Sequence, residues 1–387
     1  MNFQASDEQQ QLADSLARVL QDHGAFEQRR AISKTEAGWN PALWGQLAQL
    51  GVTALGIPEA YGGLGRLDGQ DEPGELSGGA VDRQLAMQAF GHALLLEPYL
   101  ASCVLGATAV REAASPAQKE ALLPGVAAGE ALLAWAHDET AGRHAPLWVE
   151  TRARRTADGW RLDGVKPLVL HAAAAGHCVV SARLHGQPDE PDGLLLFLVD
   201  TRNTGVSLRP YRLIDDTPAG ELSLRDAPAQ LLGQDADHAR AAAAIKTTLA
   251  AGSAAACADM VGSMACAFEL TTAYVNTRQQ FGRLIGEYQA VRHRVADMAV
   301  HLEMARSMAF AAAVAADDLA APGALADMAR AKLAIGRAAR ALCHAAIQTH
   351  GGIGMTEEYA VGHCLRRIHV MDQLFGDEAA QARRLKP

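Results

Sequence analysis

The sequence predicts an α+β fold in three consecutive parts. Apolar residues recur at helical spacing in the first third, short alternating runs between Gly and Asp turns fill the middle, and long alanine-rich runs follow. We therefore expect an N-terminal α-helical domain (1–130), a middle antiparallel sheet domain (131–235), either a barrel or a sandwich, and a C-terminal four-helix bundle (236–387). A chain of 387 residues is also too long for one small core.

Helix-start signals mark the N-terminal domain. Ser6 precedes a run with leucines at helical spacing, so it is expected to cap the first helix. Ser115 and Pro116 predict the start of a further helix near the end of the domain. Between these signals, the segment Asp68–Gly79 is rich in Gly, Pro and Asp and predicts a loop.

The period changes in the rest of the chain. Trp148–Arg154 alternates polar and apolar residues, and Asp158-Gly159 is one of several turn signals in the middle domain. From Ala236 on, Ala, Leu and Met dominate, with Pro322-Gly323 as the one clear internal break, which predicts four long helices. The alanine excess allows close helix approach and favours an oligomer that buries further surface.

A glycine-broken turn, Gly351–Gly354, follows the last alanine-rich run. Thr356 is expected to cap the next helix, with Glu357 and Glu358 in its first turn. Backbone amides at such a turn suit an anion such as a pyrophosphate. The turn by itself favours the alternative of a plain helix C-cap and loop.

Composition excludes several classes of protein. The net charge of −9 without a basic face argues against a nucleic-acid partner. Six scattered cysteines without a C-x-x-C pair predict reduced, buried thiols, no metal site and a cytoplasmic location. The polar N-terminal segment is not expected to be a signal peptide. No uncharged apolar run reaches the roughly 18 residues of a membrane span, so no membrane association is expected.

Several separate segments resemble the acyl-CoA dehydrogenase family of flavoproteins, in the same order and over essentially the whole chain. The closest matches to the family's motifs are "RQQFG" followed by Gln289 and "ADM", and the "QTHGGIG" turn. In chain order, all of the matching segments are Gly51–Gly65, Leu122–Glu130, Gly164–Lys166, Arg278–Gly282, Ala296–Met298 and Gln348–Gly354.

The resemblance implies a middle β-barrel and an FAD cofactor. It also implies oxidation of the Cα–Cβ bond of an acyl-CoA thioester to the trans-2-enoyl-CoA, in a dimer or tetramer, with electron-transfer flavoprotein as the acceptor. In relatives, the Arg of "R-x-x-FG" reaches the FAD pyrophosphate of a neighbouring subunit, which here is Arg278. A surface salt bridge is the alternative role for Arg278, and bundle packing is the alternative for Gln280, Ile285 and Tyr288. The implied FAD residues are Arg278, Gln280, Phe281, Ile285, Tyr288, Gln289, Gln348, Gly351, Gly352, Asp377 and His137.

The sequence departs from the family where relatives cradle the flavin ring. The stretch His137–Arg143 keeps only the Ala-Gly of the usual loop, and His137 stands in the place of a Thr. A simple role at the end of a strand is the alternative for His137. The second flavin strand reads Leu168–Ala172 and lacks the usual aromatic and hydroxyl residues.

The expected catalytic base is also replaced. Counted from Gly351, its position falls on Phe375, and the other position known in the family falls on Gly252. Asp372 and Asp377 are the nearby acids, with a flavin-edge contact or a helix cap as their alternative roles. Two hypotheses remain: a dehydrogenase with a relocated base, and a base-less subunit of a heterotetramer with a base-bearing paralogue. The "LFGD" ending resembles the small subunits of pimeloyl-CoA and steroid side-chain dehydrogenases. An oxidase or monooxygenase and a non-catalytic scaffold of the same fold are further alternatives.

Overall fold

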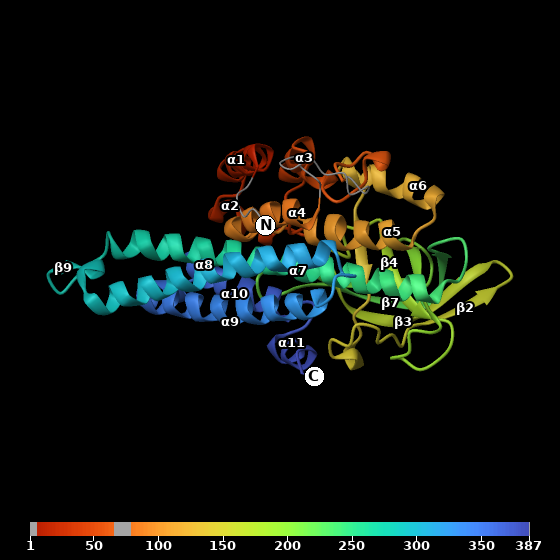
Figure 1. Cartoon of the computed structure of the whole chain (residues 1–387). Helices are drawn as coiled ribbons and strands as arrows, with labels where there is room; N and C mark the ends of the chain where they lie inside the picture. Colours follow the sequence, from red (N-terminus) through yellow and green to blue (C-terminus); the bar gives the residue numbers. More distant parts are fainter. Residues whose placement is uncertain (1–5, 66–78, 387) are drawn as a thin grey trace. The chain divides into compact units, whose positions relative to one another are not determined.

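The computed structural model describes residues 6–65 and 79–386 (Figure 1). Its described residues form two compact units. One, here called the sheet unit, takes residues from Met1–Val19, Ala31–Arg83 and Leu96–Gly252. The other, here called the bundle unit, takes residues from Leu20–Arg30, Gln84–Leu95 and Ser253–Pro387. The predicted domain boundaries at 130 and 235 stay a prediction, and the predicted loop from Asp68 lies almost wholly outside the described residues.

The N-terminal helices begin where the sequence predicts. Ser6 and Gln9 cap the first helix reciprocally, because the Gln9 amide donates to Ser6 Oγ at 3.2 Å and the Ser6 amide donates to Gln9 Oε1 at 3.0 Å. Ser115 and Gln118 form the same capping box at a later helix. A fully buried π-helix, Leu100–Gly106, leads directly into α5. The helices are α1 (Asp7–His23), α2 (Phe26–Ser33), α3 (Pro41–Gln49), α4 (Ala80–Ala93), α5 (Ala107–Ala113) and α6 (Pro116–Ala127).

Seven strands form one sheet that closes on itself. β4 pairs with β2 and β5, β5 pairs with β7, and β7 pairs with β3, which returns to β2. This closure confirms a barrel, but the prediction of a purely antiparallel sheet is wrong, because β1 and β2 each run parallel to β4. The strands are β1 (Leu133–Ala136), β2 (Arg152–Thr156), β3 (Gly159–Leu170), β4 (His177–Arg183), β5 (Leu194–Asp200), β6 (Val206–Arg212) and β7 (Pro218–Leu231).

Most of the barrel interior is apolar. Its core includes Leu162, Val180, Phe197 and Leu222, all completely buried. At roughly 25 cal/mol for each Å² of apolar surface removed from water, such residues each stabilise the barrel by about 2 kcal/mol.

Long helices build the bundle unit. The 38-residue α7 is apolar and long enough to cross a membrane by composition, but 83% of its most apolar window is buried within the protein, as in a core helix. α8 ends at Asp317 and α9 begins at Ala324, which confirms the predicted break. The helices are α7 (His238–Val275), α8 (Gln289–Asp317), α9 (Ala324–His350), α10 (Ala360–Gln373) and α11 (Glu378–Arg384), with the short strands β8 (Gln279–Gln280) and β9 (Arg283–Leu284).

Two close contacts hold the bundle unit together. A Cβ on Gly91 would lie 2.0 Å from the Asp259 carbonyl oxygen, so only glycine lets α4 approach α7 this closely. On α7, the buried Asp259 carboxylate accepts from Arg367 Nε at 2.9 Å and from its terminal nitrogen at 2.7 Å. This two-pronged pair links α7 to α10.

Candidate cofactor and active site

A two-residue hairpin turn presents Phe281 to solvent. Strands β8 and β9 are joined by Phe281 at φ 54° and Gly282 at φ 85°, the signs that a tight hairpin turn requires. Glycine adopts this geometry without strain, but a bulky side chain does so only rarely. Phe281 is nevertheless 92% exposed. Uncommon backbone conformations of this kind cluster at functional sites, which makes Phe281 a candidate site residue.

The Tyr288 side chain contacts the backbone of the hairpin turn. Its hydroxyl lies 3.2 Å from the Gln280 carbonyl oxygen and 3.3 Å from that of Phe281. The Arg283 guanidinium lies 3.9 Å from the centre of the Tyr288 ring. Ile285, which begins a short 3-10 turn before Tyr288, is half-buried. The predicted cofactor roles of Gln280, Ile285 and Tyr288 stay predictions beside these structural contacts.

Three predicted cofactor residues are exposed polar side chains. Arg278, Gln289 and Gln348 all face solvent. Within residues 6–65 and 79–386, none of the three side chains makes a hydrogen bond or an ion pair. They offer a planar guanidinium and two amide groups to a group from outside the chain.

The glycine turn after α9 is open. Gly351 has φ 66°, which accounts for glycine there. Gly352 has no such constraint, and a Cβ added to it would meet nothing within 4 Å. Nothing in the described chain therefore requires glycine at position 352. A ligand or a second chain that approaches the backbone closely would require it.

The hairpin and the glycine turn lie at the same end of the bundle. The rings of Tyr274, in the last turn of α7, and His350, the last residue of α9, stack with centroids 4.5 Å apart. Figure 1 shows the hairpin at this end of α7 and α8. The shared donor set of guanidinium, amides and open backbone fits the oxygens of a pyrophosphate. These residues therefore fit the cofactor that the sequence implies, FAD.

A second group of candidate site residues follows the C-terminal end of α10. Phe375, at φ 61°, and Gly376, at φ 107°, turn the chain between α10 and α11. The buried Lys332 amine donates to the carbonyl oxygens of Asp372 at 2.7 Å and Gly376 at 2.8 Å. Gln381 Nε2 donates to the Phe375 carbonyl oxygen at 3.2 Å. These contacts hold a bulky residue in an uncommon backbone conformation.

The acids near Phe375 already have partners. Asp377 Oδ1 accepts from the Ala380 amide at 2.8 Å and caps α11. The buried Asp372 carboxylate is paired with Arg340, which also pairs with Glu378. The alternative position, Gly252, is buried within α7. Neither expected base position therefore carries an acid, and both candidate replacements are engaged inside the chain.

The structure does not bring this turn to the glycine turn. Lys332 and His350 are both on α9, 18 residues apart, which is about 27 Å along a helix. Asp377 therefore lies far from Gly351 and Gly352 within one chain.

His137 lies in a buried polar cluster of the barrel. Its Nε2 donates to the Pro146 carbonyl oxygen at 3.1 Å, so its Nδ1 accepts from the Ser181 hydroxyl at 2.9 Å. The Lys166 amine donates to the same hydroxyl and, at 2.7 Å, to Glu139. Burial, with the nearby Lys166 charge, lowers the pKa of His137 to about 3, so the ring is neutral. Both ring nitrogens are used inside the barrel, and the FAD role of His137 stays a prediction.

The sequence did not indicate the Lys166–Glu139 ion pair. Its members lie 27 positions apart, and the barrel brings both to the interior, where Lys166 is completely buried. The strand around Lys166 also carries Arg161 and Asp163, so its sequence gave no signal that this lysine would be buried with a partner.

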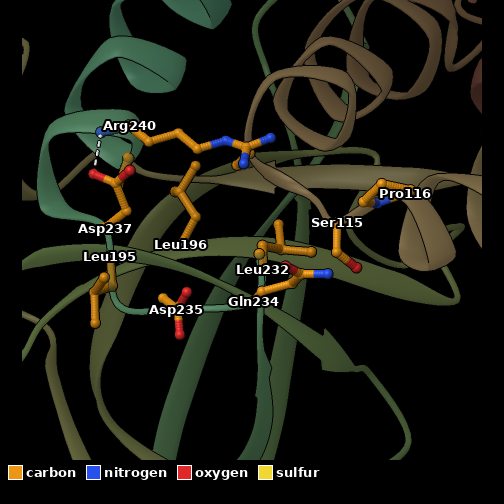
Figure 2. A pocket seen from close by; sticks show the side chains of 12 residues that line it. Ser115, Pro116, Leu195, Leu196, Leu232, Gln234, Asp235, Asp237 and Arg240 are labelled. Atoms are coloured by element: carbon orange, nitrogen blue, oxygen red, sulfur yellow. Dashed lines mark hydrogen bonds between the residues drawn. The ribbon is translucent and has the colours of Figure 1, made fainter.

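A small polar pocket of about 150 Å³ lies in the sheet unit, between the start of α7 and the end of α5 (Figure 2). Figure 2 shows Asp237 and Arg240 on its α7 side, joined by a 2.9 Å bond from the Arg240 amide to Asp237 Oδ1. Ligand sites for drug-sized molecules usually measure about 300–1,000 Å³. This pocket is therefore too small for a dinucleotide.

Comparison with known proteins identifies the family. The acyl-CoA dehydrogenase N-terminal, middle and C-terminal domain profiles match residues 6–130, 135–227 and 242–386. The acyl-CoA dehydrogenase IpdE2 of Mycolicibacterium smegmatis is 30% identical over 98% of both chains. The L-prolyl-[peptidyl-carrier protein] dehydrogenase of Pseudomonas fluorescens is also 30% identical, over 95% of this chain and 93% of its own.

Solved structures of similar fold support the same family. A variant of the Tcur3481-Tcur3483 steroid ACAD superimposes with a TM-score of 0.82 at 28% identity, covering 98% of this chain and 96% of its own. The ChsE4-ChsE5 complex from Mycobacterium tuberculosis gives 0.83 at 25% identity, covering 100% and 98%. With all three domains matched in order and a 30% identical relative along its length, the chain belongs to the acyl-CoA dehydrogenase family.

Proposed function

We propose that this chain is the base-less, FAD-sharing subunit of a heteromeric acyl-CoA dehydrogenase. The observation that carries the proposal is at the C-terminal turn. Counted from Gly351, Phe375 would stand where the resemblance places the catalytic carboxylate. The adjacent acids are Asp377, which caps a helix, and Asp372, which pairs with Arg340.

The bundle end would hold part of FAD. Arg278 would pair with the pyrophosphate, Gln289 and Gln348 would supply amide contacts, and the open backbone at Gly351 and Gly352 would allow close approach. When bound, FAD supplies the hydride acceptor for the substrate's β-hydrogen. Because the Phe375 turn lies about 27 Å along α9 from the glycine turn, one chain would contribute to two different FAD sites.

A dehydrogenase needs a base for the α-proton of the thioester. A phenyl ring cannot accept a proton, so the base must come from another position or another chain. Two similar structures carry paired names, the Tcur3481-Tcur3483 steroid enzyme and the ChsE4-ChsE5 complex. These names support assembly with a second, different chain. In the proposal that partner would bear the missing Glu, with electron-transfer flavoprotein as the expected acceptor.

The second hypothesis is a homo-oligomeric dimer or tetramer with a relocated base. Asp377 is the stronger candidate, since only Oδ1 serves the cap of α11. Asp372 is the weaker one, because a base would have to leave its buried pair with Arg340. Either carboxylate would then take the α-proton of an acyl-CoA held beside Phe375.

Co-expression tests the proposal. The chain, tagged at one end, is expressed alone and together with each acyl-CoA dehydrogenase paralogue that has a Glu at the base position. We expect a stable complex with one paralogue, with FAD retained in the complex and lost from the lone chain. A lone chain that forms a homo-oligomer with a full complement of FAD would instead support the relocated base. A protein that takes up no FAD alone or with any paralogue would indicate a non-catalytic scaffold.

A further inference from the structure

A cluster of two histidines and an aspartate lies in the sheet unit. Its members are His185 and Asp192, from the loop between β4 and β5, and His238, at the start of α7. One potential ligand atom from each lies within 4.8 Å of the other two. Two imidazoles and a carboxylate are a donor set found at zinc and other first-row metal sites.

The loop between β4 and β5 is built to face His185 toward Asp192. The Leu184 amide donates to the Gly193 carbonyl oxygen at 2.7 Å and closes the loop. His185 Nδ1 then lies 3.9 Å from Asp192 Oδ2. Gly193 has φ 80°, and a Cβ there would lie 2.3 Å from the His185 carbonyl oxygen. Glycine at position 193 is therefore required for this close approach.

A buried arginine fixes the backbone of the loop. Arg183 is completely buried, and its guanidinium donates to the carbonyl oxygens of Asp192 at 2.6 Å and Pro188 at 2.9 Å. It also donates to the Val149 carbonyl oxygen at 3.2 Å. The Asp192 carboxylate thus extends from a segment held by the barrel interior, which reduces the entropy lost when a metal binds.

His238, the first residue of α7, is oriented as a metal ligand. Its Nδ1 lies 3.3 Å from the Leu194 carbonyl oxygen. A carbonyl oxygen only accepts, so Nδ1 carries the proton and Nε2 keeps its lone pair. Metal-binding histidines are commonly fixed in this way by a backbone carbonyl. The His185 and His238 ring centroids are 5.4 Å apart at an angle of 69°, so the rings are not stacked on each other.

The cluster is open to solvent. The side chains of His185 and Asp192 are 52% and 73% exposed, so an ion can enter from solution. Asp189 and Glu190 belong to the same loop, and their charges offset those of Arg183 and of Arg152, which donates to the Gly186 carbonyl oxygen.

We propose that His185, Asp192 and His238 bind one Zn²⁺ ion per chain, with water completing its coordination. The ion would link the β4–β5 loop to the first turn of α7, and so stabilise this junction within the sheet unit. The sequence did not predict it, because the ligands lie 7 and 46 residues apart, without the short spacing of a metal motif.

Calorimetric titration of the tag-free, EDTA-treated full-length chain with Zn²⁺ tests the site. We expect one ion per chain, and an affinity at least about tenfold lower in each of His185→Gln, Asp192→Asn and His238→Gln. His293→Gln removes an exposed imidazole from α8 and should leave the affinity unchanged. Mg²⁺ should not compete, because imidazole is a poor ligand for that hard cation.

Thermal unfolding separates loss of the site from loss of the fold. In EDTA, the three variants should unfold at the same temperature as the parent chain. Added Zn²⁺ should raise the unfolding temperature of the parent and of His293→Gln, and not that of the three variants. Absence of Zn²⁺ binding by the parent, or equal binding by the variants, would overturn the proposal. Mg²⁺ binding that is lost in Asp192→Asn and kept in both histidine variants would assign the loop to non-specific acidic attraction and would also overturn it.

Discussion

At the scale of single residues, the structure is most informative where residues adopt strained backbone conformations. Phe281 and Phe375 both have positive φ, and each stands in a motif by which the sequence resembles its family. The Tyr288 hydroxyl donates to the Phe281 carbonyl oxygen, and Lys332 and Gln381 donate to carbonyl oxygens of the Phe375 turn. Strain that is kept in place by several surrounding hydrogen bonds is typical of functional sites.

Arg278 gives the first prediction at this scale. Arg278→Ala should weaken FAD binding about tenfold to a hundredfold, because a hydrogen bond to a charged group contributes about 1.5–3 kcal/mol. Arg278→Lys should recover only part of this affinity, since an ammonium lacks the two-pronged geometry. Fluorescence titration of the apoprotein complex with FAD measures the effect. Arg294→Ala, at an exposed position on α8, is the control, and an equal loss there would remove the specific role of Arg278.

Asp377 gives the second prediction at this scale. Asparagine caps a helix about as well as aspartate, so Asp377→Asn should keep α11 and change the free energy of unfolding by less than about 0.5 kcal/mol. If the chain supplies no base, the rate of flavin reduction by substrate in the complex should also change less than about threefold, because no proton transfer depends on this carboxylate. Stopped-flow absorbance measures that rate. A drop of several hundredfold with an intact fold would make Asp377 the base.

At the scale of elements, buried ionisable groups link α9 to the Phe375 turn and join the strands of the barrel. Lys332 connects α9 to two carbonyl groups that flank Phe375. In the barrel, the cluster around Lys166 connects β3 to β4 through Ser181. Each group is held away from its ordinary protonation equilibrium by burial, so each makes stability depend on pH in a defined direction.

Lys332 should give a rise in stability at alkaline pH. Burial lowers its pKa from 10.5 to about 8. Between these values the unfolded chain keeps a proton that the folded chain has lost, so the contribution of this group to the free energy of unfolding increases with pH. Urea unfolding of the parent chain and Lys332→Met from pH 8 to 10 measures the difference. The parent should gain stability relative to the variant across this window, and parallel curves would contradict the assignment.

His137 should give a loss of stability in acid. Its pKa is lowered from 6.5 to about 3, chiefly by burial. Below pH 6.5 the unfolded chain therefore binds a proton that the folded chain does not, and stability falls by up to about 1.4 kcal/mol per pH unit from this group. His137→Gln should flatten that fall, whereas His344→Gln, at an exposed position on α9, should not. Unfolding curves between pH 6.5 and 4.5 compare the three proteins, and a parent slope equal to that of His137→Gln would contradict the buried, neutral ring.

Element boundaries show how far the sequence could predict the fold. The helix starts at Ser6 and Ser115 were both predicted, and in the structure each is formed by a capping box with a residue three positions on. Thr356 was expected to cap the next helix, and this prediction is wrong, because a 3-10 turn over Gly351–Met355 delays α10 to Ala360. The Thr356 hydroxyl instead donates to the Ile353 carbonyl oxygen at 2.9 Å. Local hydrogen bonding within the turn overrides the capping preference.

At the scale of the whole molecule, the order of helical, sheet and bundle segments followed from periodicity, because that signal is local, whereas the barrel was implied only by the family resemblance. Periodicity did not predict the parallel pairing of β1 with β4 or the Lys166–Glu139 ion pair, because both depend on which distant segments of the chain meet. The candidate site shows the same division. The "RQQFG" segment and the glycine turn were found as motifs, and a helix cap was one of the roles expected for Asp377. The pairing of Asp372 with Arg340 emerged only from packing.

For the whole molecule, the proposal is that this chain would contribute FAD-binding residues and no base of its own. The most direct test is anaerobic bleaching of the flavin band near about 450 nm, a property of the cofactor itself. The chain loaded with FAD is mixed with a panel from butyryl-CoA to palmitoyl-CoA and a steroid side-chain acyl-CoA. We predict no bleaching by the lone chain, and bleaching by at least one substrate once a paralogue with the catalytic Glu is bound. Rapid bleaching by the lone chain would contradict the account.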